Sequence, residues 1–186
     1  MSQARRSAAR HIRRLAYLAA GRAASSFAAF LDRDIRALEP RLCASSGAAT
    51  AGRGETGVIF EIEGEVNGLM ALLLPTGGRR WLVDALCPGQ DPAGPMAESA
   101  LRETGNIVAS HAVSAMADHL GATVTLSTPT LVETHADRVF GRMLDERRTR
   151  FEGVATQTEL YTGDGTRCAL LLFAPDATDP GRDRGR

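Results

Sequence analysis

The sequence predicts a mixed α/β (α+β) fold with a pseudo-two-fold internal repeat of helix–strand–hairpin units. In this fold an antiparallel-rich sheet carries two long packed helices. The chain has 186 residues, 44% of them hydrophobic, which is enough for an ordinary globular core. Each half reads as a helix, a strand, a connection and a hairpin. When Tyr17 is aligned with Asn106, further pairs fall into register: Leu31 with Leu120, Ile35 with Val124, and Pro40 with Pro129.

Apolar periodicity and turn residues define the elements of the first half. They are predicted as a helix over 7–31, a strand over 34–43 interrupted by Pro40, a small-residue loop over 43–55, a hairpin of 58–63 with 69–74, and a short helix over 80–86. The dipeptide Asn67-Gly68 supports a tight turn in this hairpin, because glycine adopts positive φ without strain. A segment rich in proline and glycine, residues 88–95, is the best boundary between the halves.

The second half repeats this order, with a helix in the connection. Its predicted elements are a helix over 98–120, a strand over 122–127, a helix over 134–148 and a hairpin of 154–161 with 168–173. Thr134 and Asp137 have the T-x-x-D spacing of a capping box for the second of these helices.

One domain is therefore expected over residues 1–175, with halves of about 5–87 and 96–175. Residues 176–186 lack large apolar side chains and are predicted to form a disordered tail.

Composition excludes several kinds of function. The formal net charge is zero, from 22 basic and 22 acidic residues, so global charge gives no argument for nucleic-acid or membrane binding. No segment approaches the roughly 20 apolar residues of a membrane span. Cys43, Cys87 and Cys168 are scattered, which favours reduced thiols and a cytoplasmic location. The four histidines share no metal-ligand spacing, so no metal site is expected.

The helix over 98–120 has two distinct faces. Ser99, Glu103, Asn106 and Ser110 share the polar one. The apolar face holds Leu101, Gly105, Val108, Ala112 and Met116. Two weak helix formers, Gly105 and Asn106, thus point in different directions. Gly105 is expected to let a neighbouring element, such as the first helix, approach closely.

Asn106 offers a carboxamide, which donates and accepts hydrogen bonds at once and can orient a water molecule. That property suits hydrolysis of an activated phosphoryl group, where positioning supplies most of the catalysis. Glu103, one turn away, could pair with a cation on a docking partner. By spacing alone, however, a polar row on a half-exposed helix is ordinarily just its solvated face, and Ser99 most simply serves as a cap or first-turn residue after Pro95.

These residues resemble the motif of the CheC/CheX/FliY family of chemotaxis phosphatases. The family pattern is Ser or Asp, three residues, Glu, two residues, Asn, and then a long gap to Pro. It stands here as Ser99, Glu103, Asn106 and Pro129, with the family's twenty-two residues between Asn106 and Pro129. Gly105 lies inside the motif and supports it. The resemblance extends over nearly the whole chain, to about Pro175.

The resemblance implies a hydrolase that removes the aspartyl phosphate from a CheY-like response-regulator receiver and so terminates a chemotaxis signal. By the same resemblance, Glu103 docks to a receiver lysine and Asn106 orients the attacking water. The Mg²⁺ and the phosphorylated aspartate belong to the receiver, so no cofactor of the protein's own is implied. A CheD-like deamidase is a possible second partner.

The first half departs from the family pattern. Arg10, Arg14 and Tyr17 occupy the motif positions, and only Pro40 remains. One working site, in the second half, is therefore expected. The altered first motif is either a solvated face or a surface for an acidic partner. An alternative for the whole protein is a non-catalytic module that binds a receiver or CheD, like a flagellar-switch component or an adaptor.

Overall fold

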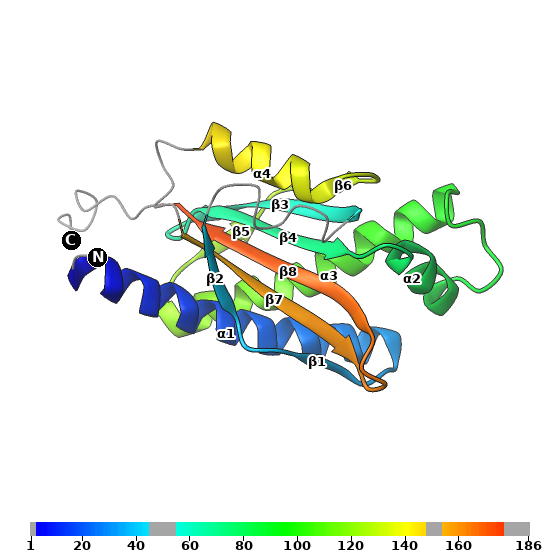
Figure 1. The fold of residues 1–186 in the computed structure, drawn as a ribbon, viewed down its shortest axis with the longest axis horizontal. Helices are drawn as coiled ribbons and strands as arrows, with labels where there is room; N and C mark the ends of the chain where they lie inside the picture. The colour runs from blue at the N-terminus through cyan, green and yellow to red at the C-terminus, as the bar shows by residue number, and fades with distance from the viewer. Residues whose placement is uncertain (1–2, 45–54, 148–153, 177–186) are drawn as a thin grey trace.

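The computed structural model describes residues 3–44, 55–147 and 154–176 (Figure 1). In chain order the elements are α1 (Gln3–Leu31), β1 (Ile35–Ala37), β2 (Arg41–Ala44), β3 (Thr56–Gly64), β4 (Gly68–Leu74), α2 (Gly78–Leu86), α3 (Pro95–Leu120), β5 (Val124–Leu126), β6 (Thr130–Val132), α4 (Ala136–Glu146), β7 (Val154–Thr162) and β8 (Arg167–Pro175). Together they form the predicted α+β fold.

The eight strands form one sheet whose neighbouring strands are antiparallel. Its order is β1-β7-β8-β4-β3-β5, with β2 also paired to β7 and β6 also paired to β3. The two halves are therefore interleaved, since the short strands of each half pair with the long hairpin of the other. Leu42 of β2 lies opposite Thr156 of β7, and Leu131 of β6 lies opposite Val58 of β3. The hairpins meet at the centre through β4 and β8, where Leu72 lies opposite Leu171.

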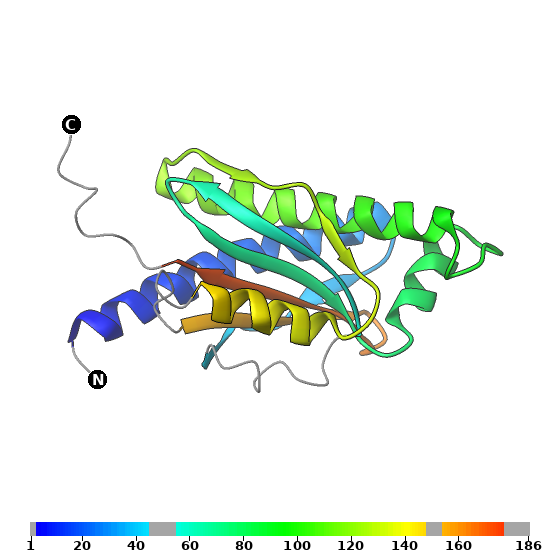
Figure 2. The same ribbon diagram turned by 90° about the horizontal axis from the view of Figure 1, so that it is seen from above.

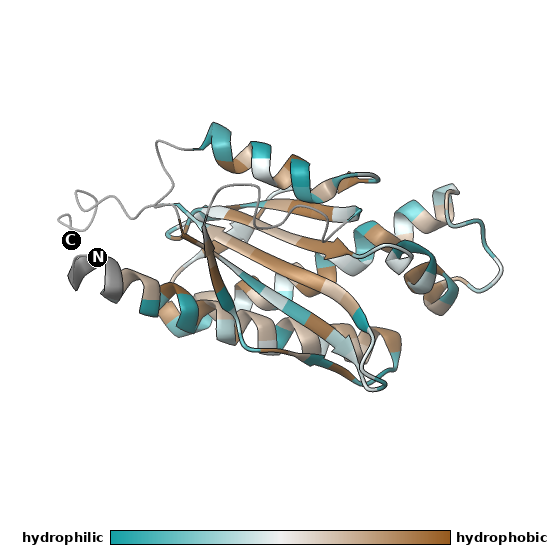
Figure 3. Cartoon of the chain, viewed as in Figure 1, coloured by the Kyte–Doolittle hydropathy of each residue, from teal (hydrophilic) through white to brown (hydrophobic). Residues whose placement is uncertain are grey.

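The helices cover the two faces of the sheet unequally. The long helices α1 and α3 lie side by side on one face (Figure 2), and α4 lies on the other (Figure 1). Figure 3 shows hydrophobic colour along the central strands β4 and β8 and hydrophilic colour on the outward side of α4. Every residue of β4 is buried, which is the pattern of a strand covered on both faces.

Two hydrophobic clusters fill the layers. The larger lies between the sheet and the long helices and includes Phe27, Phe60 and Met116. The smaller lies under α4 and includes Ile59 and Phe140. Burying one such side chain contributes about 1.5–3 kcal/mol, so these clusters fix the long helices against the sheet.

The two prolines aligned by the repeat each divide a pair of short strands. The predicted strand over 34–43 is two strands, β1 and β2, with Pro40 between them. The predicted strand over 122–127 is shortened to β5, and β6, which the sequence did not suggest, follows Pro129. Proline lacks the N–H needed for a ladder hydrogen bond, so each strand breaks there and the chain resumes pairing further along the partner.

Three helix and terminal boundaries correct the sequence expectations. The predicted capping box at Thr134 is wrong. Helix α4 begins after His135, whose φ is 53°, and no side chain caps the helix. Helix α3 begins earlier than residue 98, at Pro95. Pro175 ends β8, and Asp176, the first residue of the predicted tail, donates its backbone N–H to the Asn67 carbonyl at 2.8 Å, so the fold extends one residue beyond the expected domain. Most of the predicted loop at 43–55 and of the predicted tail lies outside the described residues.

Candidate functional site

Helix α3 carries the motif on a continuous run of 26 residues. Gly94 is the N-cap and Pro95 occupies the first turn, where proline lacks only an N–H that the helix would leave unpaired. Gly121 ends the helix in the left-handed region, at φ 63°. Ser99 is therefore neither the cap nor part of the first turn, and that sequence expectation was wrong.

The predicted faces of α3 are both present. Leu101, Gly105, Val108, Ala112 and Met116 are all buried against the sheet and α1. On the opposite face Ser99, Glu103 and Asn106 are exposed and Ser110 is half-buried. The motif residues thus lie in one row on the surface of a helix whose other side is part of the core.

Gly105 allows α3 to lie directly on β3. A Cβ atom placed on Gly105 would lie 2.7 Å from Cβ of Val58 and 2.8 Å from each of its methyl carbons. The expected close approach therefore exists, but the neighbour is a strand and not the first helix. Next to this contact, Thr104 is fully buried and donates its hydroxyl to the Ala100 carbonyl at 2.7 Å. The motif is consequently held at a short, fixed distance from the sheet.

Glu103 and Asn106 both face solvent, one turn apart. Neither side chain makes a hydrogen bond or an ion pair with another residue that the structure describes. A carboxylate and a carboxamide with free bonding capacity are thereby presented on a rigid surface. This surface is open to solvent.

Pro129 lies beside the start of the motif, in the connection from β5 to β6. Its carbonyl oxygen accepts a 3.1 Å hydrogen bond from Nη1 of Arg102. The same connection is tied to β3, because Ser127 donates its backbone N–H to the Glu61 carbonyl and accepts the Glu61 N–H on Oγ, both at 2.9 Å. The structure thus brings the distant proline to the motif helix.

Sequence reasoning missed Arg102. In the sequence, only its position next to Glu103 could have indicated a role. A long side chain there can extend along the surface to a neighbouring loop. The arginine at the aligned position of the first half, Arg13, makes a comparable lateral contact through Nη2 to Oε2 of Glu39, at 3.1 Å.

The first-half motif positions lie on α1 and are all exposed. Arg10 and Arg14 stand where the second half has Ser99 and Glu103, and Tyr17, 63% exposed, stands in place of Asn106. The single hydroxyl of Tyr17 replaces the separate carbonyl and amide groups of Asn106, and Arg14 has the opposite charge to Glu103. Of the two long helices, therefore, only α3 carries the glutamate and asparagine that the motif requires.

Other features bear on cofactors and location. Within the described ranges no group of three or more His, Cys, Asp and Glu side chains is arranged to hold a metal ion. None of the described helices combines the length and apolar character needed to cross a bilayer. Cys87 and Cys168 are free thiols.

Comparison with known proteins matches both the motif and the fold. The model of the CheC-like family matches residues 96–133, which hold the whole motif. No curated protein is a significant sequence match. Among solved structures, the chemotaxis protein CheX from Desulfovibrio desulfuricans aligns at 13% identity and a TM-score of 0.64, covering 87% of this chain and 99% of that one.

Two further structures have the same fold. FliY from Thermotoga maritima aligns at 16% identity and a TM-score of 0.60, covering 93% of this chain and 90% of that one. CheX in the CheX–CheY–BeF3–Mg complex from Borrelia burgdorferi aligns at 16% identity and a TM-score of 0.58, covering 87% of this chain and 98% of that one. Residues 96–133 therefore match the CheC-like family, and the chain as a whole shares the fold of these chemotaxis proteins.

Proposed function

We propose that the protein is a phosphatase that hydrolyses the aspartyl phosphate of a CheY-like receiver and so terminates a chemotaxis signal. The observation that carries the proposal is the exposed Asn106 carboxamide, one turn from Glu103 on a helix that Gly105 seats against Val58. The proposal places the protein in the cytoplasm with its receiver. The related CheX that forms a complex with CheY supports a receiver as the partner.

Asn106 has the chemistry needed to position a water molecule for attack. Its carbonyl oxygen accepts a hydrogen bond from the water, which directs an oxygen lone pair at phosphorus in line with the bond to be broken. The new P–O bond forms to the water oxygen, and the P–O bond to the aspartyl carboxylate breaks. The products are a free aspartate carboxylate, inorganic phosphate and the proton released by the water.

The leaving group in this reaction is a carboxylate, which departs without protonation. The protein therefore needs no general acid. In this scheme the receiver supplies Mg²⁺, which neutralises charge on the phosphoryl oxygens. The contribution of α3 is to hold one water molecule in a productive orientation, and bulk water is excluded only when the receiver docks over this open surface.

Glu103 is suited to set the register of the docked receiver. Its exposed carboxylate lies one turn before Asn106, so a receiver lysine that pairs with it fixes where Asn106 enters the partner's site. An exposed ion pair contributes only about 0.2–1 kcal/mol, and its effect grows as docking excludes water. Glu103 thus acts mainly on alignment and association.

The test is phosphate release from a purified, phosphorylated CheY-like receiver in the presence of Mg²⁺. We expect the protein to accelerate release over the receiver's own rate at sub-stoichiometric amounts, since a catalyst turns over. A panel of receivers from the same cell should be used, because α3 does not identify which is the substrate. If no receiver in the panel loses phosphate faster, the proposal is wrong.

The competing function is a module that binds a receiver, or a CheD-like deamidase, without hydrolysis. Binding alone does not require both Glu103 and Asn106. Complex formation with phosphorylated receiver that leaves its phosphate lifetime unchanged would favour the binding module.

A further inference from the structure

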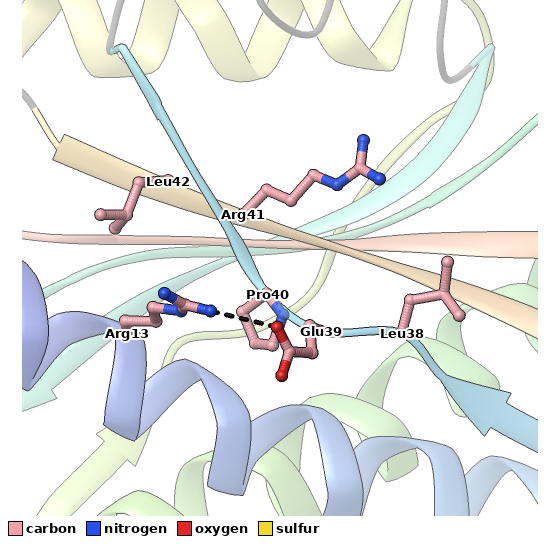
Figure 4. A pocket seen from close by; sticks show the side chains of 6 residues that line it. All are labelled: Arg13, Leu38, Glu39, Pro40, Arg41 and Leu42. Atoms are coloured by element: carbon pink, nitrogen blue, oxygen red, sulfur yellow. Dashed lines mark hydrogen bonds and ion pairs between the residues drawn. The ribbon is translucent and has the colours of Figure 1, made fainter.

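The connection from β1 to β2 forms an open groove next to α1 (Figure 4). Its volume is about 490 Å³, and it is lined by Arg13, Leu38, Glu39, Pro40, Arg41 and Leu42. Leu38 is 46% exposed and Leu42 is 44% exposed. In Figure 4, Arg13 reaches across to Glu39, while Arg41 and Leu42 project to opposite sides of the strand.

Helix α1 adds three exposed side chains to the same region. Arg10, Arg14 and Tyr17 lie within about one turn of Arg13, on the outward side of the helix. We call the groove together with these three residues the first-half surface. Tyr17, Leu38 and Leu42 are three of the four large hydrophobic side chains that are exposed in the described part of the chain.

The first-half surface is strongly positive although the chain as a whole is neutral. It holds four arginines, Arg10, Arg13, Arg14 and Arg41, and one acid, Glu39, which gives a formal charge of 4 − 1 = +3. Glu39 is already paired with Arg13. Arg10 and Arg14 form no ion pair with any residue that the structure describes, so their guanidinium groups are open to a partner.

The residues around Pro40 differ from the aligned residues around Pro129, so the first half has changed at positions outside the motif as well. Around Pro129 the chain has Ser127 and Thr130, which the repeat aligns with Leu38 and Arg41 around Pro40. The sheet supports the alignment, because β2 and β6 pair in the same way with β7 and β3. The first half thus has exposed Leu38 and Arg41 where the second has small polar side chains, a replacement that solvation alone does not require. Leu42 keeps a leucine counterpart, Leu131, which is half-buried.

We propose that the first-half surface binds an acidic segment of a partner protein that also carries apolar side chains. Arginine pairs with carboxylates through two parallel hydrogen bonds, and tyrosine and arginine are enriched at binding hot spots. The two leucines beside Pro40 would receive apolar side chains of the segment. This inference is independent of the phosphatase proposal, and it gives the protein two docking surfaces, on α1 and on α3.

Two other occupants fit the surface less well. A second copy of the chain, docked by the same surface, would bring two sites of charge +3 together, and like charges oppose that contact. Nucleic acid would satisfy the arginines but would leave Leu38 and Leu42 against a charged backbone. An acidic, partly apolar protein segment satisfies both kinds of side chain.

The test uses a fluorescein-labelled peptide of alternating glutamate and leucine. Its control is a peptide of the same pattern in which lysine replaces every glutamate. We expect the acidic peptide to bind the full chain and the lysine peptide not to bind. The pair Arg10→Glu and Arg14→Glu should weaken binding by at least about tenfold. The pair Leu38→Ser and Leu42→Ser should weaken it to a similar degree, which a purely electrostatic contact would not show.

Arg138 and Arg142 provide the matched control, because they are exposed, four residues apart on α4, and on the opposite face of the sheet. Their replacement by glutamate should leave peptide affinity unchanged. The proposal is overturned if the acidic peptide does not bind, if this control pair weakens binding as much as the Arg10 and Arg14 pair, or if the leucine pair has no effect. It is also overturned if a DNA duplex binds the surface more tightly than the peptide.

Discussion

Arg102 joins the motif helix to the strand connection by donating Nη1 to the carbonyl oxygen of Pro129 at 3.1 Å. The hydrogen bond spans 27 positions of sequence and links the residue beside Glu103 to the most distant motif member. A charged donor on a neutral acceptor makes a stronger hydrogen bond than two neutral groups. This contact explains how a proline far along the chain shapes the surface around Glu103.

Arg102→Ala is expected to loosen this connection. We predict a loss of about 0.5–1.5 kcal/mol in the free energy of unfolding, the usual net value of one hydrogen bond. The rate of receiver dephosphorylation should also fall, because the surface beside Glu103 is less ordered. Urea unfolding and phosphate release measure the two effects. Arg138→Ala, an exposed arginine on α4, is the control and should change neither.

Asn106→Ala removes the group proposed to orient water. We expect the acceleration of receiver dephosphorylation to fall by about 100-fold or more, as when a positioned hydrogen-bonding group is removed from other active sites. Stability should not fall, because Asn106 is exposed and alanine is a better helix former. Ser114→Ala, at another exposed position of α3, should retain full activity. Activity that survives in Asn106→Ala would exclude the proposed mechanism.

Glu103→Lys should affect docking more than turnover. Reversing the charge replaces attraction to a receiver lysine by repulsion, and we expect KM to rise roughly five- to tenfold, about 1–1.4 kcal/mol, with a smaller change in kcat. The wild-type KM should rise with salt more steeply than that of the variant. Glu146→Lys, an exposed acid at the end of α4, controls for the change in net charge. A fall in kcat alone would contradict a docking role.

Gly105→Ala should destabilise the protein even though alanine favours helix. The added methyl group meets Val58 at 2.7–2.8 Å, and overpacking of this kind costs about 1–3 kcal/mol against a propensity gain of about 1 kcal/mol. Chemical denaturation measures the balance. Gly21→Ala on α1 is the matched control, since its methyl group would meet nothing within 4 Å, and it should stabilise.

A double-mutant cycle separates the Gly105 contact from general damage. Val58→Ala removes two of the three atoms that crowd the new methyl group. The two substitutions together should therefore cost less than the sum of their separate costs. Strict additivity would show that the close approach of α3 to β3 does not determine the effect.

Cys168 gives a prediction on pH. The thiol is 3% exposed, and burial raises its pKa from 9.0 to about 11. Between these values the unfolded chain has lost this proton and the folded chain keeps it, so the thiol's contribution to stability is complete below about pH 9 and declines as pH rises towards 11. The difference in unfolding free energy between wild type and Cys168→Ala should shrink over that interval. A constant difference would contradict the assigned cause.

Local patterns in the sequence were sufficient for the helices, the hairpins and the motif face. The buried row of α3 and the exposed row with Glu103 and Asn106 follow from the period of 3.6 residues, which is a property of neighbouring positions. The fold class and the CheC-like resemblance could be predicted because the repeat and the motif spacing are visible along the chain, and both were confirmed.

Contacts between distant segments were decided only by the tertiary structure. The sequence did not reveal β6, the crossing of each half's short strands to the other half's hairpin, or the hydrogen bond from Arg102 to Pro129. It also suggested the wrong neighbour for Gly105, which meets Val58. Periodicity tells which face of an element is buried, but many surfaces could cover that face. The choice among them depends on how all the elements pack together at once.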